Sequence, residues 1–364
     1  MIPCSRVVAA LCNIAVWYCC GPGFVMISRT RCCRRGSLHW SMCDSNWSSG
    51  SINARAPTVL LVMSASRSGS TVLCNLLGQS TGGFGVGELH RLWDADAFAN
   101  RMCSCGELVS QCSVWRPILE ACYGSAEPSV LRPIFAEIQR HRDACTRVRH
   151  MPALFQRLSP ALRVHRRHYL DALEAVYSAI HKITGCRVVV DASKLPAYAS
   201  VLLDSTTLDV RVVFLVRDAR ATAFSWRRRK SMAVRGRTFT TAQYGLPASA
   251  REWLITNWAA DRLAAGLSRD RCLRLRYEDL MRQPQRSLAQ IARLAGLDER
   301  ALPLCGPDQA CLSTAHLIAG NQNRFHTGRI ALRPDEEWRA AMRRSDRWLV
   351  TLLTWPLLWR FGYL

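Results

Sequence analysis

The sequence predicts an α/β fold, a three-layer sandwich with a mainly parallel central sheet. Short apolar runs rich in β-branched residues recur along the chain, and segments with helical spacing lie between them. Strands that alternate with helices are typical of a parallel sheet covered by helices on both faces. The expected strands lie near residues 58–65, 84–87, 187–192, 211–217 and 272–276.

The length of 364 residues favours one large domain with an N-terminal extension over two full domains. We assign residues 57–364 to this domain and residues 1–56 to a leader that ends in a linker rich in Ser, Asn and Gly. The formal net charge is +22, but the basic residues are spread along the whole chain and are nearly all Arg. We therefore expect no nucleic-acid binding, and we expect this charge to favour a polyanionic cofactor or substrate.

Residues 7–27 are mostly apolar. A helix needs about 20 such residues to span a bilayer, so this stretch is long enough. Gly21-Pro22-Gly23 interrupts it, and the arginines that follow favour keeping the C-terminal side in the cytoplasm. Three interpretations stay open: a signal anchor that gives membrane association, a cleaved targeting segment, and an unstructured leader. An anchor would place the protein in the Golgi membrane or lumen, and otherwise we expect a cytoplasmic protein.

The stretch from Thr58 to Leu77 reads as a buried strand, a small polar turn and a helix start. Loop N–H groups and the positive end of the helix dipole converge in such a unit, which suits an anion. An ordinary turn with capping serines is the alternative. A nucleotide triphosphatase loop would need a Lys, and this turn has none. The predicted phosphate loop consists of Arg67, Ser68, Gly69, Ser70 and Thr71.

Two charged residues follow predicted strands at their carboxyl ends, where ligand-facing side chains of a parallel sheet gather. Glu88 follows the second strand and could take a proton from an acceptor hydroxyl; the alternative is a helix-start Glu that complements the dipole. His90 is the reserve candidate for this base. Lys194 follows the strand at 187–193 and could neutralise charge on a departing group, with a solvent-exposed Lys as the alternative.

A third strand end carries arginines and a hydroxyl. The strand at 211–218 contains Arg217 and runs into residues 219–230, which have helical spacing. Ser225 lies two turns along this helix and Arg229 one turn further, so we expect all three on one face. This combination suits a phosphate monoester, although the run 227–230 alone is also typical of a solvated basic face.

Three motifs together resemble the sulfotransferases that use 3′-phosphoadenosine 5′-phosphosulfate (PAPS). They are Ser-Arg-Ser-Gly-Ser-Thr after the first strand, Asp-Ala-Ser-Lys after a middle one, and Leu-Val-Arg-Asp-x-Arg with a Ser eight residues after its first Arg. The most similar branch is the broad one that includes the tyrosylprotein and carbohydrate sulfotransferases. The resemblance spans roughly residues 57–364 and implies a P-loop-like sulfotransferase fold.

The resemblance implies a role for each matching residue. The first loop would hold the 5′-phosphosulfate, and Arg217, Ser225 and Arg229 would grip the 3′-phosphate. Glu88 would be the base and Lys194 the transition-state lysine. Two further matches are the strand-exit segment 275–280 and the loop at 316–325, and the residues that they imply for cofactor contact are Tyr277, Asn321 and Arg324. Acceptor-recognition residues have no match, so the acceptor stays open.

Cys103, Cys105 and Cys112 form a compact group with Trp115. Three thiols without a fourth Cys or a His nearby in the sequence are an incomplete ligand set for structural zinc. We therefore expect a disulfide or a packing cluster and no metal. The total of 17 cysteines leaves at least one thiol unpaired if the others form disulfides, and the redox compartment stays open.

Two further segments carry structural expectations. Residues 125–183 predict amphipathic helices that form an insertion near the acceptor site and are broken at Pro128, Pro133, Pro152 and Pro160. Residues 348–363 are strongly apolar, contain Pro356 and are too short to span a bilayer. We expect them to pack against the core, with a peripheral membrane contact as the alternative.

The expected function is transfer of a sulfuryl group from PAPS to a hydroxyl, or less favourably an amine, of an acceptor such as a carbohydrate. No metal is required, since cationic side chains and a helix end can neutralise the donor. A nucleoside or small-molecule kinase is the first alternative, and the missing loop Lys argues against it. A non-catalytic protein that binds a polyanion is the second alternative.

Overall fold

The computed structural model describes residues 57–146, 159–229 and 231–364. A five-stranded, all-parallel sheet with the strand order β2-β3-β1-β4-β7 forms the centre of this region. All five predicted strands are confirmed to within a few residues. They are β1 (Thr58–Met63), β2 (Gly83–Gly87), β3 (Val188–Lys194), β4 (Asp209–Val216) and β7 (Cys272–Arg276). The apolar stretch at 7–27 with its three open interpretations, the linker before residue 57 and the predicted break at Pro152 lie outside the described residues.

Strand β1 shows why the sheet is covered on both faces. Val59 and Leu61 belong to one hydrophobic core and Leu60 and Val62 to another, as the two-residue period of a strand requires. All four side chains are fully buried, which is the pattern of a central parallel strand.

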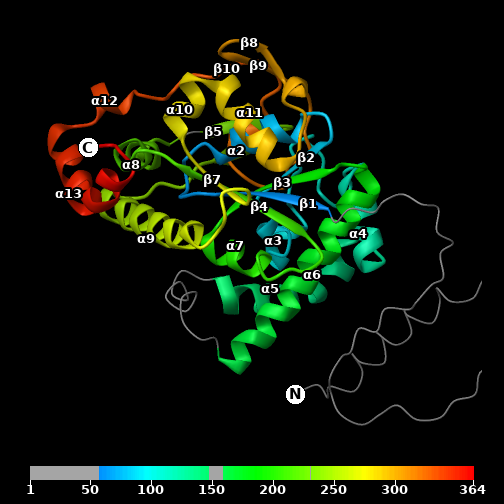
Figure 1. Cartoon of the computed structure of the whole chain (residues 1–364). Coiled ribbons are helices and arrows are strands. Elements are labelled where there is room, and N and C mark those ends of the chain that lie inside the picture. Colours follow the sequence, from blue (N-terminus) through cyan, green and yellow to red (C-terminus); the bar gives the residue numbers. More distant parts are fainter. Residues whose placement is uncertain (1–56, 147–158, 230) are drawn as a thin grey trace, which may run out of the picture. The chain divides into compact units, whose positions relative to one another are not determined.

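Helices cover both faces, and the predicted three-layer sandwich is confirmed. One face packs against α6 (Pro160–Thr184), α7 (Pro196–Leu202), α8 (Ala219–Arg227) and α9 (Leu246–Ala265). The other face packs against α2 (Ser70–Gly78), α10 (Tyr277–Arg282) and α11 (Pro284–Ala295). Figure 1 shows α2, α10 and α11 on one side of the sheet and α7 and α9 on the other.

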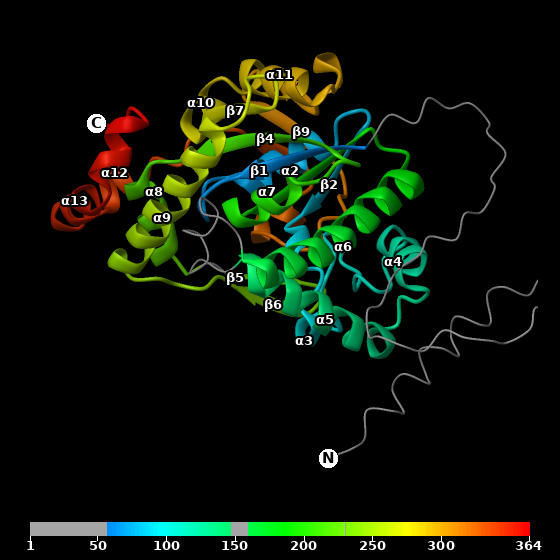
Figure 2. The ribbon, with the colours of Figure 1, turned by 60° about the horizontal axis from the view of Figure 1, so that its bottom comes forward.

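The helical insertion predicted at 125–183 contains α5 (Pro128–Thr146) and α6, which lie side by side (Figure 2). The short helices α3 (Ala95–Phe98) and α4 (Trp115–Tyr123) precede it. The prediction that Pro133 breaks this region is wrong, because Pro133 lies inside α5. Proline removes one backbone hydrogen bond there, but the buried Leu131 and Phe135 hold the helix against the core.

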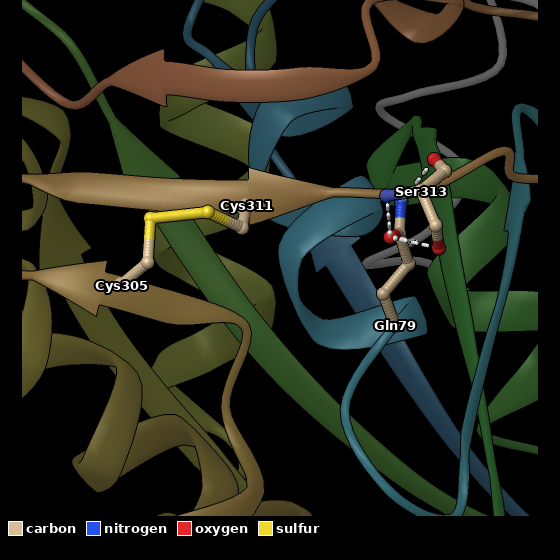
Figure 3. The surroundings of a disulfide bond; sticks show 4 residues. All are labelled: Gln79, Cys305, Cys311 and Ser313. Atoms are coloured by element: carbon tan, nitrogen blue, oxygen red, sulfur yellow. Dashed lines mark hydrogen bonds between the residues drawn. A yellow bond between two sulfur atoms is a disulfide. The ribbon is translucent and has the colours of Figure 1, made fainter.

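Two small antiparallel sheets complete the region: β5 (Ser231–Val234) with β6 (Arg237–Thr240), and β8 (Leu304–Gly306), β9 (Gln309–Leu312) and β10 (Gly328–Ala331). A disulfide joins Cys305 in β8 to Cys311 in β9 (Figure 3). After β9, the backbone N–H of Ser313 donates to Gln79 Oε1 at 2.7 Å, just beyond α2. The second sheet is thereby tied to the helix that follows the predicted phosphate loop.

The apolar C-terminal segment forms α13 (Arg344–Arg360), preceded by α12 (Trp338–Ala341). The expectation that it packs against the core holds for one side only, which includes Val350, Leu357 and Leu358. The opposite side exposes Trp348, Leu352, Trp355 and Trp359, because the apolar residues outnumber the positions that one helix face can bury. Among the described residues, the helices are too short or too polar to cross a membrane.

Candidate active site

The predicted phosphate loop connects β1 to α2. Arg67 and Gly69 both have left-handed backbone conformations, with φ of 67° and 88°. A Cβ added at Gly69 would lie 2.7 Å from the ring of Tyr277. Both the left-handed backbone and the nearby ring therefore require glycine at this position. Ser68, Ser70 and Thr71 are buried at the start of α2, where helix N–H groups can bind an anion.

The structure brings together the two sets of residues that the resemblance assigns to the 5′ and the 3′ phosphate of the donor. Arg217 Nη1 donates to the backbone carbonyl of Arg67 at 2.9 Å, and Arg67 Nε donates to Ser225 Oγ at 3.1 Å. This proximity follows from the sheet, because β1 and β4 are adjacent parallel strands and their carboxyl ends meet at one edge. Burial, followed by the charges of Arg217 and Arg228, lowers the pKa of Arg67.

Tyr277 begins α10 and lies against this loop. The guanidinium of Arg217 is 4.5 Å from the centre of its ring, a cation–π arrangement that fixes the position of the arginine. Tyr277, for which the resemblance implies cofactor contact, therefore lies against the phosphate loop at Gly69.

The expectation that Arg229 shares a helix face with Ser225 is wrong. Helix α8 ends at Arg227, and Arg228 is already extended, so the helical spacing on which the prediction depends stops before Arg229. Arg229 is exposed. Arg228 turns inward instead, and its Nη2 lies 2.6 Å from Asp335 Oδ2.

The carboxylate of Asp335 connects two arginines, since its Oδ2 also lies 3.3 Å from Arg217 Nη2. The residues fit an anion at this place. Ser68 Oγ, Arg217 Nε and Arg228 Nε are buried and have no hydrogen-bond partner within the described part of the chain. Buried donors without acceptors are costly, and the oxygens of a phosphate group would supply those acceptors.

Glu88 and Lys194 form a half-buried ion pair between the ends of β2 and β3, where Lys194 Nζ donates to Glu88 Oε1. Lys194 adopts a left-handed conformation with φ of 68° at a register shift of β3 against β1. Burial raises the pKa of Glu88, but the charges of Lys194, His90 and Arg91 outweigh it and lower the pKa to about 2.

A buried network behind this pair sets the end of β3. Asp191 accepts hydrogen bonds from the hydroxyls of Tyr177 at 2.5 Å and Tyr198 at 2.8 Å. It also accepts from Ser193 N at 2.6 Å, while Ser193 Oγ accepts from His90 N at 3.1 Å. The reserve base His90 therefore lies beside Glu88, but burial lowers its pKa to about 3, which makes it a weak base.

The loop after β9 lies over the start of α2. Asn321 N donates to Thr71 Oγ1 at 3.1 Å, while its side chain accepts from Asn323 N. Arg324 Nη1 donates to Gly320 O at 2.9 Å, and burial lowers its pKa to about 10, with Glu88 opposing that shift. Asn321 therefore borders the phosphate loop at Thr71, whereas Arg324 contacts the neighbouring Gly320 and lies close enough to Glu88 to feel its charge.

Glu252 is a site residue that the sequence analysis missed. Its Oε1 accepts a hydrogen bond of 3.2 Å from the N–H of Ser66, directly before the phosphate loop, and its Oε2 is buried without a partner among the described residues. Burial raises its pKa. Glu252 lies inside α9, far from any strand end in the sequence, so that no motif or spacing identified it.

The cysteine group also differs from expectation. Cys103, Cys105 and Cys112 are free thiols, so the disulfide alternative is wrong, whereas the packing alternative is confirmed because Cys103 and Cys112 are buried in the core. The structure adds His316 from a distant loop, and the four ligand atoms lie within 4.8 Å of one another. The fourth ligand was missed because it lies 204 residues after Cys112.

The family model described as "Sulfotransferase family" matches residues 59–301. Among solved structures, a sulfotransferase domain from the curacin biosynthetic pathway is similar, with 16% identity and a TM-score of 0.44 over 82% of this chain and 98% of that one. A sulfotransferase domain from the olefin synthase of Synechococcus PCC 7002 shows 19% identity and a TM-score of 0.42 over 83% of this chain and 96% of that one. No curated protein matches. Since the match to the family spans well over half of the sequence, the chain belongs to the sulfotransferase family.

Proposed function

We propose that the protein transfers a sulfuryl group from PAPS to a hydroxyl of an acceptor, with an amine as the less favoured acceptor group. The observation that carries this proposal is the contact between Arg217 and the phosphate loop at Arg67, with unpartnered donors around it. One bisphosphorylated nucleotide could supply acceptors to both groups of residues at once.

Residues 67–71 would hold the 5′ end of the donor with loop N–H groups, hydroxyls and the Arg67 guanidinium. Arg217 and Ser225 would bind the 3′-phosphate, and Arg228 replaces Arg229 as the third group because its side chain turns toward them. Tyr277, Asn321 and Arg324 would border the nucleotide. PAPS supplies an activated sulfuryl group on a phosphate leaving group.

Glu88 would accept the proton of the acceptor hydroxyl, and Lys194 would offset negative charge that builds on the leaving side. The ion pair keeps Glu88 ionised but weakly basic, with a pKa of about 2. If Lys194 turned toward the bound phosphate, its charge would no longer counteract the effect of burial on Glu88. The pKa of Glu88 would then rise. Donor binding would thereby activate the carboxylate that takes the proton of the acceptor hydroxyl.

Calorimetry with adenosine 3′,5′-bisphosphate tests the donor site, and transfer of radiolabelled sulfate from PAPS to glycan, peptide and small-alcohol acceptors tests the reaction. We expect binding that Arg217→Ala weakens and transfer to at least one hydroxyl acceptor, with carbohydrates as the first candidates. Absence of heat with the bisphosphate would overturn the donor assignment. Binding without transfer to any class of acceptor would favour the non-catalytic alternative.

A further inference from the structure

We propose that Cys103, Cys105, Cys112 and His316 bind one zinc ion. Three ligands come from a ten-residue stretch before α4, and the fourth comes from the loop after β9. Cys₃His is a common ligand set of structural zinc sites. This proposal does not rest on the proposed reaction.

The distances between the ligand atoms match a zinc tetrahedron. Cys112 Sγ lies 3.7 Å from both Cys103 Sγ and Cys105 Sγ. His316 Nδ1 lies 3.2 Å from Cys112 Sγ and 3.7 Å from Cys103 Sγ. Zn–S bonds of about 2.3 Å in tetrahedral geometry give an S···S edge of roughly 3.8 Å. Sulfur atoms in a disulfide are only about 2.05 Å apart, so the spacing is that of ligands around an ion.

The backbone on both sides of the cluster is fixed by other groups. Ser104 Oγ donates to Ala315 O at 2.7 Å and accepts from Leu317 N at 2.8 Å. Trp115 Nε1 donates to His316 O at 2.6 Å. These bonds hold the two segments together without using the thiols or the imidazole, so the four ligand atoms are left facing one another.

The charge of the surroundings suits a thiolate site. Zinc with three thiolates and a neutral imidazole carries a net charge of −1. Arg324 Nη2 approaches Met102 O at 3.4 Å, and the Arg235 side chain lies over Gly106, where an added Cβ would meet its Nε at 2.8 Å. Because Arg235 is already paired with Glu107, Arg324 is the guanidinium group that can offset the negative charge of the thiolates, and it feels the charge of Cys103. Soft sulfur ligands with one imidazole in tetrahedral array favour zinc over the hard cations Mg²⁺ and Ca²⁺.

The ion would hold a segment that borders the candidate active site. After His316, Ile318 N donates to Val86 O at 3.0 Å, and Glu88 N donates to Ala319 O at 3.2 Å. Asn321 N then reaches Thr71 Oγ1. Zinc bound at His316 would thus fix the position of residues 315–321 beside the end of β2 and the start of α2. It would be a structural metal that supports the segment next to Glu88.

The test is metal analysis of the full chain purified without chelator, with Cys112→Ser and His316→Gln as site variants. Residues 1–56 contain seven further cysteines, so the decisive quantity is the loss of one zinc equivalent per chain relative to the unsubstituted protein. Cys272→Ser is the matched control, because Cys272 is a free, half-buried thiol outside the cluster. We expect it to retain all of its zinc.

Cobalt replacement provides a measurement that does not depend on whether the variants fold. Co²⁺ in the unsubstituted protein should give a thiolate-to-metal charge-transfer band and the strong visible absorption of tetrahedral cobalt, both displaced by one equivalent of Zn²⁺. Equal zinc content in the unsubstituted protein and Cys112→Ser would overturn the proposal. A disulfide between any two of the three cysteines, found by mass spectrometry of the unreduced native protein, would overturn it as well.

Discussion

Arg217 donates a hydrogen bond of 2.9 Å to the backbone carbonyl of Arg67, although 150 residues separate them in the sequence. The contact exists because β1 and β4 are neighbours and both end at the same edge of the sheet. It joins a strand-to-helix loop and a buried arginine into a single cationic site.

The first prediction concerns Arg217→Ala. A hydrogen bond that involves a charged group contributes about 1.5–3 kcal/mol, so binding of adenosine 3′,5′-bisphosphate should weaken by roughly 10- to 150-fold. Arg228→Ala should also weaken binding, whereas Arg229→Ala should change it little because Arg229 is exposed beyond the end of α8. Calorimetry on the three variants measures this order. A larger loss in Arg229→Ala than in Arg228→Ala would restore the role that the helical spacing predicted.

The second prediction concerns Asp335, whose carboxylate lies between Arg217 and Arg228. A phosphate would have to compete with this carboxylate for the same guanidinium groups. Asp335→Asn should therefore tighten binding of the bisphosphate, by about tenfold if about 1.4 kcal/mol of competition is removed. Glu336→Gln is the control, because Glu336 pairs with the partly exposed Arg282 instead. Weaker binding in Asp335→Asn would mean that Asp335 orients the arginines and does not compete.

Much of this site was predictable because parallel strands place their carboxyl ends together. Glu88, Lys194 and Arg217 each follow a buried apolar run, and the sheet order then brings them to one edge. Asp335 and His316 were not assigned, since they lie in loops whose path depends on contacts made more than 100 residues away. Arg229 was misassigned because α8 ends at Arg227, where the chain turns toward β5. Helical periodicity in the sequence does not show where a helix ends.

The third prediction concerns the base. Glu88→Gln keeps the size of the side chain but cannot accept a proton, so turnover should fall by roughly 10²- to 10⁴-fold while bisphosphate binding stays nearly intact. Glu252→Gln is the informative comparison, because the half-buried carboxylate of Glu252 bonds to Ser66 N directly before the phosphate loop. Radiolabelled transfer measures turnover in both variants. Normal turnover in Glu88→Gln together with loss in Glu252→Gln would move the base to Glu252.

The fourth prediction is a pH dependence of stability. The pKa of Glu88 is lowered to about 2 in the folded protein, so its contribution to stability is present above the unfolded pKa of about 4.3 and is lost as the pH falls toward 2. Lys194→Met removes the main opposing charge and leaves burial to raise the pKa of Glu88. The loss of unfolding free energy caused by this substitution should therefore shrink as the pH falls from 7 to 4.

Urea unfolding at several pH values measures this loss. Lys182→Met is the matched control, since Lys182 is exposed at the end of α6, and its effect should stay small at every pH. A loss in Lys194→Met that stays constant from pH 7 to 4 would show that the ion pair does not determine the protonation of Glu88.

The last prediction concerns Gly69, which combines a φ of 88° with a ring against its Cα. Gly69→Ala should destabilise the fold by about 1–3 kcal/mol from the backbone alone, and the added Cβ would also push Tyr277 away from the loop. The double variant Gly69→Ala/Tyr277→Ala removes the steric part and retains the backbone part. Gly245→Ala is a neutral control, because Gly245 has a φ of −67° and open space at its Cβ position.

If the double variant binds the bisphosphate as well as Tyr277→Ala alone, the left-handed conformation at Gly69 is not required for the phosphate site. If it binds more weakly, the loop geometry itself contributes to anion binding, as the fixed direction of the N–H groups at a helix start requires.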